Sequence, residues 1–202
     1  MGLLWLGWFG FNGGSALAAN DIAVLAMFNT NLAACAAGFV WVLIGYKKTG
    51  KSSLLGFVTG ALAGLVAITP AAGYIPTWAA LVIGLAVGAL CYITVLLRGR
   101  SKIDESLDAW AVHGCGGLWG AIATGIFAAA IVPGAAGLIT GNAYQLWIQS
   151  IGAIVTMVYS FVVTYIIAWI INKTRGLRVK EEEEYVGLDI TQHGEKMITG
   201  VC

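Results

Sequence analysis

The sequence predicts an all-α, polytopic transmembrane helical bundle. Hydrophobic residues make up 59% of the 202 residues and charged residues 10%, whereas a soluble domain carries about a quarter charged residues. The mean hydropathy is +0.85. The apolar residues form continuous runs instead of the apolar-polar alternation of a membrane β-barrel, so we expect the bundle to consist of helices.

Helices that cross a hydrocarbon core of about 30 Å need about 20 apolar residues. The segments that approach this length are residues 1–18, 22–46, 53–69, 78–97, 109–131 and 144–172. We therefore predict about six spans within residues 1–172. The more polar residues 173–202 are expected to form a cytoplasmic tail.

Basic residues orient this predicted bundle. They lie in the connections at residues 47–51 and 98–102 and in the tail, whereas the connections at residues 70–76 and 132–142 carry no charge. Positively charged loops stay on the cytoplasmic side of a membrane. We expect a multi-pass protein of the cell membrane with both ends of the chain in the cytoplasm.

The first span contains a dense group of aromatic residues. It has no basic flank and no cleavage motif, so it is not expected to be a signal peptide, and the chain reads as if it begins within a longer protein. Trp5, like Tyr46, suits a belt at the membrane interface. Phe11 followed by Ser15 suits a cation site instead, because rings attract cations and a hydroxyl accepts hydrogen bonds.

Glycines recur every fourth residue in the middle spans. They are Gly56, Gly60 and Gly64, then Gly84 and Gly88, then Gly116 and Gly120. Small residues at this spacing share one helix face and let two helix backbones approach closely. The pattern predicts a densely packed bundle.

The acidic and cysteine residues have simple structural interpretations. Asp21 and Asp108 precede apolar runs and are expected to be helix N-caps, although Asp108 could also orient a group near a pore. The cysteines are interpreted as small buried hydrophobic residues, and they are Cys35, Cys91, Cys115 and, in the tail, Cys202. We predict no metal, no cofactor and no enzymatic nucleophile with its base.

His113 is the one basic side chain inside a long apolar run. An ionisable residue in hydrocarbon faces a pathway or a partner by default. One interpretation is a neutral ring hydrogen-bonded to a neighbouring helix. The other is a proton relay or the lining of a narrow file of small polar molecules, since a neutral imidazole offers one donor and one acceptor.

Several motifs together resemble the ammonium transporters of the Amt/MEP/Rh family. They are GWFGFNGGS at 7–15, ITPAAGY at 68–74, DAWAVHG at 108–114, GLRV at 176–179, GLD at 187–189 and HGE at 193–195. Members of that family have eleven spans in two inverted halves and assemble as homotrimers with one pore per subunit. The motifs match spans six to eleven, the C-terminal portion, so the resemblance implies that the first half is missing and that this chain is inactive alone.

The resemblance also implies roles for individual residues. Phe11 matches a pore-gating ring, Ser15 part of an external ammonium site, and His113 one of two paired pore histidines; Trp8, Thr69 and Asp108 are candidate supports. Ammonium would lose its proton outside and cross as ammonia, because dehydrating the cation in an apolar pore is costly. The partners implied are lipid and a PII-type regulatory protein at the cytoplasmic face, with no nucleic acid.

Two other functions remain open on the residues alone. One is a non-conducting membrane protein that keeps the fold for assembly or signalling. The other is a proton-coupled transporter of another small solute, with His113 in the proton relay.

Overall fold

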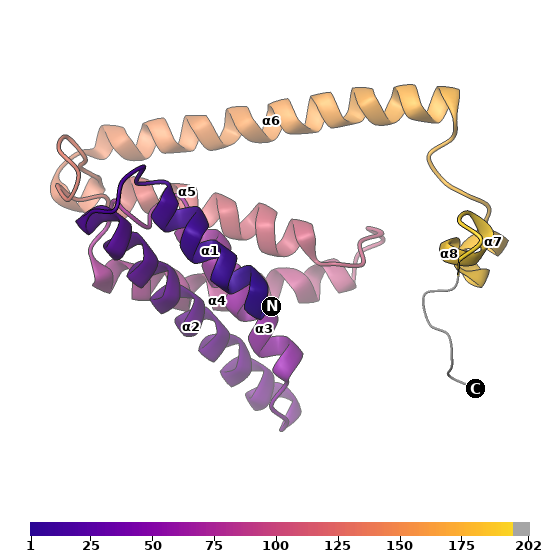
Figure 1. Cartoon of the computed structure of the whole chain (residues 1–202), viewed down its shortest axis with the longest axis horizontal. Helices are drawn as coiled ribbons and strands as arrows, with labels where there is room; N and C mark the ends of the chain where they lie inside the picture. Colours follow the sequence, from indigo (N-terminus) through magenta and orange to yellow (C-terminus); the bar gives the residue numbers. More distant parts are fainter. Residues whose placement is uncertain (196–202) are drawn as a thin grey trace. The chain divides into compact units, whose positions relative to one another are not determined.

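The computed structural model describes residues 1–195, and these residues form helices and connections without a β-strand. The α-helices are α1 (Gly2–Gly14), α2 (Asp21–Thr49), α3 (Leu54–Ile68), α4 (Thr77–Gly99), α5 (Cys115–Phe127), α6 (Ala143–Thr174), α7 (Glu181–Val186) and α8 (Leu188–Thr191) (Figure 1). A π-helical turn, η1 (Trp110–Gly114), leads directly into α5, and a 3-10 turn, η2 (Leu138–Thr140), precedes α6. The all-α prediction is confirmed for the described part of the chain.

Each of the predicted spans contains a helix. α2, α4 and α6 are long and apolar enough to cross a membrane by length and composition, and α3 is a shorter apolar helix. α1 has 13 residues, and α5 has 13 residues that continue η1. Whether the shorter helices also cross a membrane stays a prediction.

Packing divides the chain into two compact units, Met1–Ile154 and Val155–Cys202. This division falls inside α6, whereas the boundary that we predict from polarity lies after residue 172. The two boundaries rest on different properties, because one follows contacts and the other follows hydropathy. The boundary between a membrane bundle and its tail therefore stays a prediction.

α2 is the central helix of the first unit. It contacts α1, α3 and α4, and α5 packs on α3 and α4. The residues buried along α2 are mostly alanines, so neighbouring backbones can come close. α3 and α4 contribute larger fully buried apolar side chains to the core, such as Leu65 and Ile83.

The glycine pattern is confirmed as close helix packing. A Cβ on Gly84 would come within 2.5 Å of the Ala33 carbonyl oxygen, and a Cβ on Gly64 would overlap the same oxygen. Gly60 and Gly88 approach the Ala37 carbonyl oxygen in the same way, at 2.9 Å and 2.6 Å. α3 and α4 therefore both press against one stretch of α2, which only glycine permits.

Some sequence predictions about helix ends and cysteines are wrong. The N-cap of α2 is Asn20, whose side chain accepts a hydrogen bond from the Ala23 amide at 3.1 Å, and Asp21 lies in the first turn. Cys91 is buried as predicted, but Cys35 is exposed on α2 and Cys115 is half-buried. Cys202 lies outside the described residues.

The second unit holds the end of α6 and the short helices α7 and α8. Its apolar side chains along α6, such as Phe161 and Tyr165, are exposed. Before α7, the Arg178 guanidinium donates to both carboxylate oxygens of Glu184, at 2.8 Å and 2.9 Å. This hydrogen bonding holds the pKa of Glu184 below its ordinary value.

Candidate functional site

A hollow of about 330 Å³ lies where α1 ends against α2 and the connection that follows α3. It brings together three of the residues singled out from the sequence, namely Phe11, Ser15 and Thr69. Its lining residues are Phe11, Asn12, Ser15, Ala16, Ile22, Ala26, Thr69, Ala72, Gly73, Tyr74 and Val132. The lining is mostly apolar with a few polar groups, as is typical of small-molecule sites.

Trp8 and Thr69 hold one wall of this hollow. The Trp8 indole Nε1 donates to the Thr69 hydroxyl at 2.8 Å, and that hydroxyl donates to the Leu65 carbonyl at 2.7 Å. The Trp8 ring meets the Phe11 ring edge to face, with centroids 5.9 Å apart. The position of Phe11 is thus fixed through Trp8 to the end of α3, although Phe11 itself is 61% exposed.

Ser15 supplies an oriented hydroxyl at the C-terminal end of α1. Its Oγ donates to the Phe11 carbonyl at 2.7 Å, so its proton is engaged and its lone pairs can accept from another donor. The C-terminal end of a helix carries partial negative charge from its aligned peptide dipoles. A ring face, an accepting hydroxyl and a helix C-terminus together suit a small cation with N–H donors.

Buried polar residues that were not predicted from the sequence also fix this region. The Asn12 side-chain amide donates to the Thr30 hydroxyl at 2.9 Å, which joins α1 to α2. The Asn29 amide donates to the carbonyls of Ala72 and Ile75, at 2.8 Å and 3.1 Å, which joins α2 to the connection after α3. The signal was present, because an amide inside an apolar span must find partners.

His113 lies elsewhere, on the π-helical turn η1. Its side chain is exposed, while the neighbouring Ala111 and Val112 are buried against α3 and α4. Within the described residues the imidazole makes no hydrogen bond, and it does not line the hollow with Phe11 and Ser15. Among the described residues, His113 therefore has no hydrogen-bond partner on a neighbouring helix, which was one of its two interpretations.

The turn that carries His113 is wider than an α-helix. The Cys115 amide donates to the Trp110 carbonyl, five residues back, and also to the Val112 carbonyl. The Cys91 thiol of α4 contacts the same Val112 carbonyl, with Sγ and oxygen 3.9 Å apart. Such π-turns insert one extra residue into a helix and often occur at functional sites.

The N-cap prediction for Asp108 is wrong. Its carboxylate binds the Arg98 guanidinium of α4, and its backbone φ of 54° lies in the left-handed region. The Glu105 carboxylate accepts from the Trp110 amide instead, so Glu105 caps the start of the turn. Neither the role of Glu105 nor the bond between Arg98 and Asp108 was predicted from the sequence.

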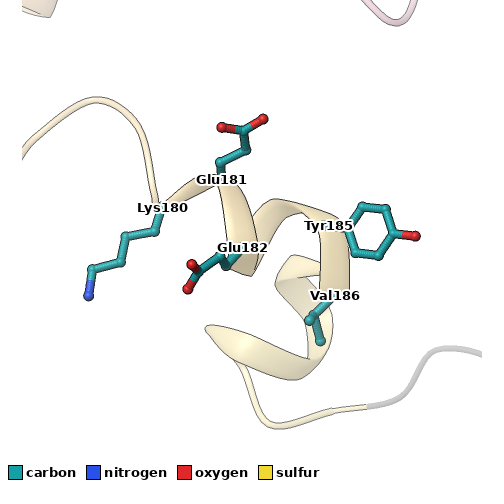
Figure 2. A pocket seen from close by; sticks show the side chains of 5 residues that line it. All are labelled: Lys180, Glu181, Glu182, Tyr185 and Val186. Atoms are coloured by element: carbon teal, nitrogen blue, oxygen red, sulfur yellow. The ribbon is translucent and has the colours of Figure 1, made fainter.

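Two further hollows lie in the described part of the chain. One, of about 420 Å³, borders the hollow at the end of α1 and shares Tyr74 and Val132 with it. The other lies along α7, and Figure 2 shows Glu181 and Tyr185 pointing in different directions there, without converging on a common point. No group of three or more His, Cys, Asp or Glu side chains among the described residues could hold a metal ion.

Comparisons with known proteins give a consistent result. Residues 1–198 match the model of the Ammonium Transporter Family. The chain is 56% identical to the ammonium transporter Amt1 of Archaeoglobus fulgidus over 98% of its own length and 50% of the relative, and 47% identical to an ammonium transporter of Bacillus subtilis over 96% and 49%. It therefore spans about half the length of the curated relatives that it matches.

Solved structures agree with these relatives. The Mep2 crystal structure of Saccharomyces cerevisiae is similar with a TM-score of 0.83 and 38% identity, over 89% of this chain and 43% of that one. A structure titled Sensor Amt Protein is similar with a TM-score of 0.84 and 36% identity, over 94% and 46%.

Proposed function

Because the chain belongs to the ammonium transporter family and is a multi-pass membrane protein, we propose that it forms half of a subunit that conducts ammonium as ammonia. The observation that carries the proposal is the hollow at the end of α1, where Phe11, Ser15 and Thr69 meet. Its ring, accepting hydroxyl and helix C-terminus match the recognition of a small N–H cation.

The hollow acts as the entrance of the pathway. Ammonium replaces part of its water shell with the ring of Phe11 and the Ser15 oxygen, while Trp8 and Thr69 keep the ring in place. The intact cation would be costly to move through an apolar interior, so it releases a proton and crosses as ammonia. Potassium has no proton to release, which makes the pathway selective.

His113 acts beyond the entrance. Its exposed side chain, on a turn whose neighbouring residues are buried, suits a surface that the remaining half of the subunit covers and supplies with a second histidine. A pair of imidazoles in contact can relay a proton, because each offers a donor and an acceptor. Replacing His113 by alanine is expected to change the charge moved per ammonium and to weaken discrimination against potassium.

The proposed membrane orientation of the subunit is based on the placement of its charges, and its proposed assembly and partner are based on its family. The basic connections and the tail face the cytoplasm of the cell membrane, the first 172 residues form the bundle, and the subunit assembles as a homotrimer. The tail contacts a PII-type regulatory protein there. Ion-pairing of Arg178 with Glu184 supports an ordered tail segment before α7.

Complementation with separate halves of the Archaeoglobus relative tests the proposal. This chain is produced in cells without ammonium transporters, alone or together with the first or the second half of that relative, and uptake of labelled methylammonium is measured. The motif order predicts uptake only with the first half and none from the chain alone. Uptake only with the second half would mean that this chain corresponds to the first half of the relative. If neither half gives uptake although both chains reach normal abundance in the membrane, the proposed transport is refuted.

The alternative of a non-conducting assembly protein is favoured by one observation. Residues 1–154 contain no histidine other than His113, so they offer it no second imidazole with which to relay a proton. Stable trimers without uptake in the same experiment would support this alternative. Proton-driven uptake of a different solute would support the third possibility.

A further inference from the structure

Three charged side chains meet where α4 ends and the π-helical turn begins. The Arg98 guanidinium binds the Asp108 carboxylate, and its Nε lies 4.0 Å from Oε2 of Glu105. The side chains of Arg98, Glu105 and Asp108 are only 20%, 14% and 26% exposed. Charges that are this little exposed need a partner. Arg98 and Asp108 are hydrogen-bonded, whereas Arg98 Nε and Glu105 Oε2 form an ion pair without a hydrogen bond.

Both carboxyl residues also hold the backbone of η1. The Glu105 carboxylate accepts from the Trp110 amide, and the Asp108 carbonyl accepts from the Val112 amide at 2.9 Å. Asp108 keeps a left-handed backbone, with φ at 54°, which is unfavourable for a residue other than glycine and persists only when its surroundings impose it. The Asp108 carboxylate is held in this conformation by its bond to Arg98 of α4.

We infer that Arg98, Glu105 and Asp108 are positioning residues for His113. The inference rests on the proposed transport function and adds a part of the site that lies outside the hollow and the pathway. The extra residue of a π-turn changes which direction the side chains of that turn face. If the turn relaxed to an α-helix, one residue less would rotate the segment by about 100°, and the imidazole would point elsewhere.

The charged cluster therefore selects the π-turn over the α-helical alternative. Arg98 fixes Asp108, the left-handed Asp108 turns the chain into η1, and Glu105 caps its first amide. The Cys91 thiol adds a contact from α4 to the Val112 carbonyl, which also accepts from the Cys115 amide. His113 follows Val112 directly, so its direction depends on all of these contacts.

Amide hydrogen exchange tests the positioning without any transport. The whole chain in lipid nanodiscs is compared with its Arg98→Met and Arg100→Met variants; both remove one positive charge near the end of α4, but the Arg100 side chain is exposed. Loss of the charge-assisted hydrogen bond is expected to speed exchange at residues 110–115 about tenfold in Arg98→Met only. Unchanged exchange, or equal acceleration in Arg100→Met, would overturn the inference.

A milder variant covers the case in which Arg98→Met does not insert. Asp108→Asn removes the carboxylate charge but keeps a residue that tolerates the left-handed region. Exchange at residues 110–115 is expected to rise in it as well, by a smaller factor. Wild-type exchange in a well-inserted Asp108→Asn would also count against the inference.

Transport by a complemented subunit then tests the link to His113. The ratio of charge moved to labelled methylammonium taken up is measured for Arg98→Met, His113→Ala and the double variant, with Arg100→Met as control. We expect both single variants to shift the ratio in the same direction and the double variant to match His113→Ala, because the two residues act through one group. Additive shifts would overturn the inference, whereas a wild-type pair without uptake would refute only the proposed transport.

Discussion

Two parts of the first unit differ sharply in burial. We call the helices packed around α2 the packed face, and the exposed residues along α1 and η1 the open face. Around α2, alanines and glycines bring three helices into backbone contact, and residues such as Ala33 and Ile83 are fully buried. Along α1 and η1, the residues proposed to handle ammonium are exposed, Phe11 and His113 among them. The core is thus closed by contacts within the chain, whereas the residues of the proposed site are exposed, as the proposal of a covering second half requires.

The largest expected effect tests the packed face. Gly84→Leu forces a side chain against the Ala33 carbonyl of α2, so we expect the free energy of unfolding in detergent micelles to fall by about 3 kcal/mol. Gly7→Leu is the matched control, because a Cβ at Gly7 has no neighbour within 4 Å. If both variants unfold alike, the two faces do not differ as described.

Gly7→Leu also tests whether the open face along α1 is covered by the complementing half. Although this variant should leave the stability of the chain unchanged, it is expected to reduce association with the complementing half, because that half would cover α1. Co-purification of the two halves measures the effect. Normal association would mean that this stretch of α1 faces lipid instead.

Asn29 gives the next largest expected effect. Asn29→Leu leaves the carbonyls of Ala72 and Ile75 without their donor and is expected to cost about 2 kcal/mol of unfolding free energy. Asn31→Leu, on an exposed face of the same helix, is the control and should change stability by less than about 0.5 kcal/mol. The same micelle unfolding measurement compares them, and equal losses would contradict the role given to Asn29.

Ser15 tests the open face with a smaller effect. Ser15→Ala removes the accepting oxygen and is expected to raise the half-saturation concentration for methylammonium uptake in the complemented subunit about fivefold, the effect of about 1 kcal/mol. Ser15→Thr keeps the hydroxyl and should stay near the wild type. An unchanged half-saturation concentration in Ser15→Ala would remove Ser15 from the entrance.

The smallest effect concerns the tail. Because the pKa of Glu184 is lowered in the folded tail, its bond to Arg178 stabilises the fold at pH values above the ordinary glutamate range, and this contribution is lost as the pH falls through the lowered pKa. NMR chemical shifts of α7 in the whole chain should therefore change below pH 4.5. Glu184→Gln should abolish that transition and Glu181→Gln should not; the reverse result would reject the pairing.

Fold class and helix positions could be predicted because they follow from hydropathy and spacing. The glycine spacing in α3 and α4 also predicted close packing, since a bare Cα is the condition for backbone contact. Asn20 took the cap expected of Asp21 because either side chain can accept the same amide hydrogen bond, and the sequence alone does not rank them. A sequence pattern therefore cannot decide which of two adjacent residues is the helix N-cap.

The site was only partly predictable for a different reason. Phe11, Ser15 and Thr69 come from separate segments, and only the folded chain brings them to one hollow. The π-turn at His113 and the left-handed Asp108 depend on Arg98, which lies 10 residues earlier on another helix. Periodicity assumes a regular helix and therefore cannot reveal a turn with an inserted residue.

The carbonyl of Ala33 faces both Gly64 and Gly84, and this has an evolutionary consequence. Enlarging either glycine alone would push a helix away from the shared oxygen, and enlarging both would compound the displacement. A single substitution at either position is therefore expected to be selected against. A library randomised at both positions and selected for membrane insertion should return glycine twice, even where the surrounding leucines and valines drift freely.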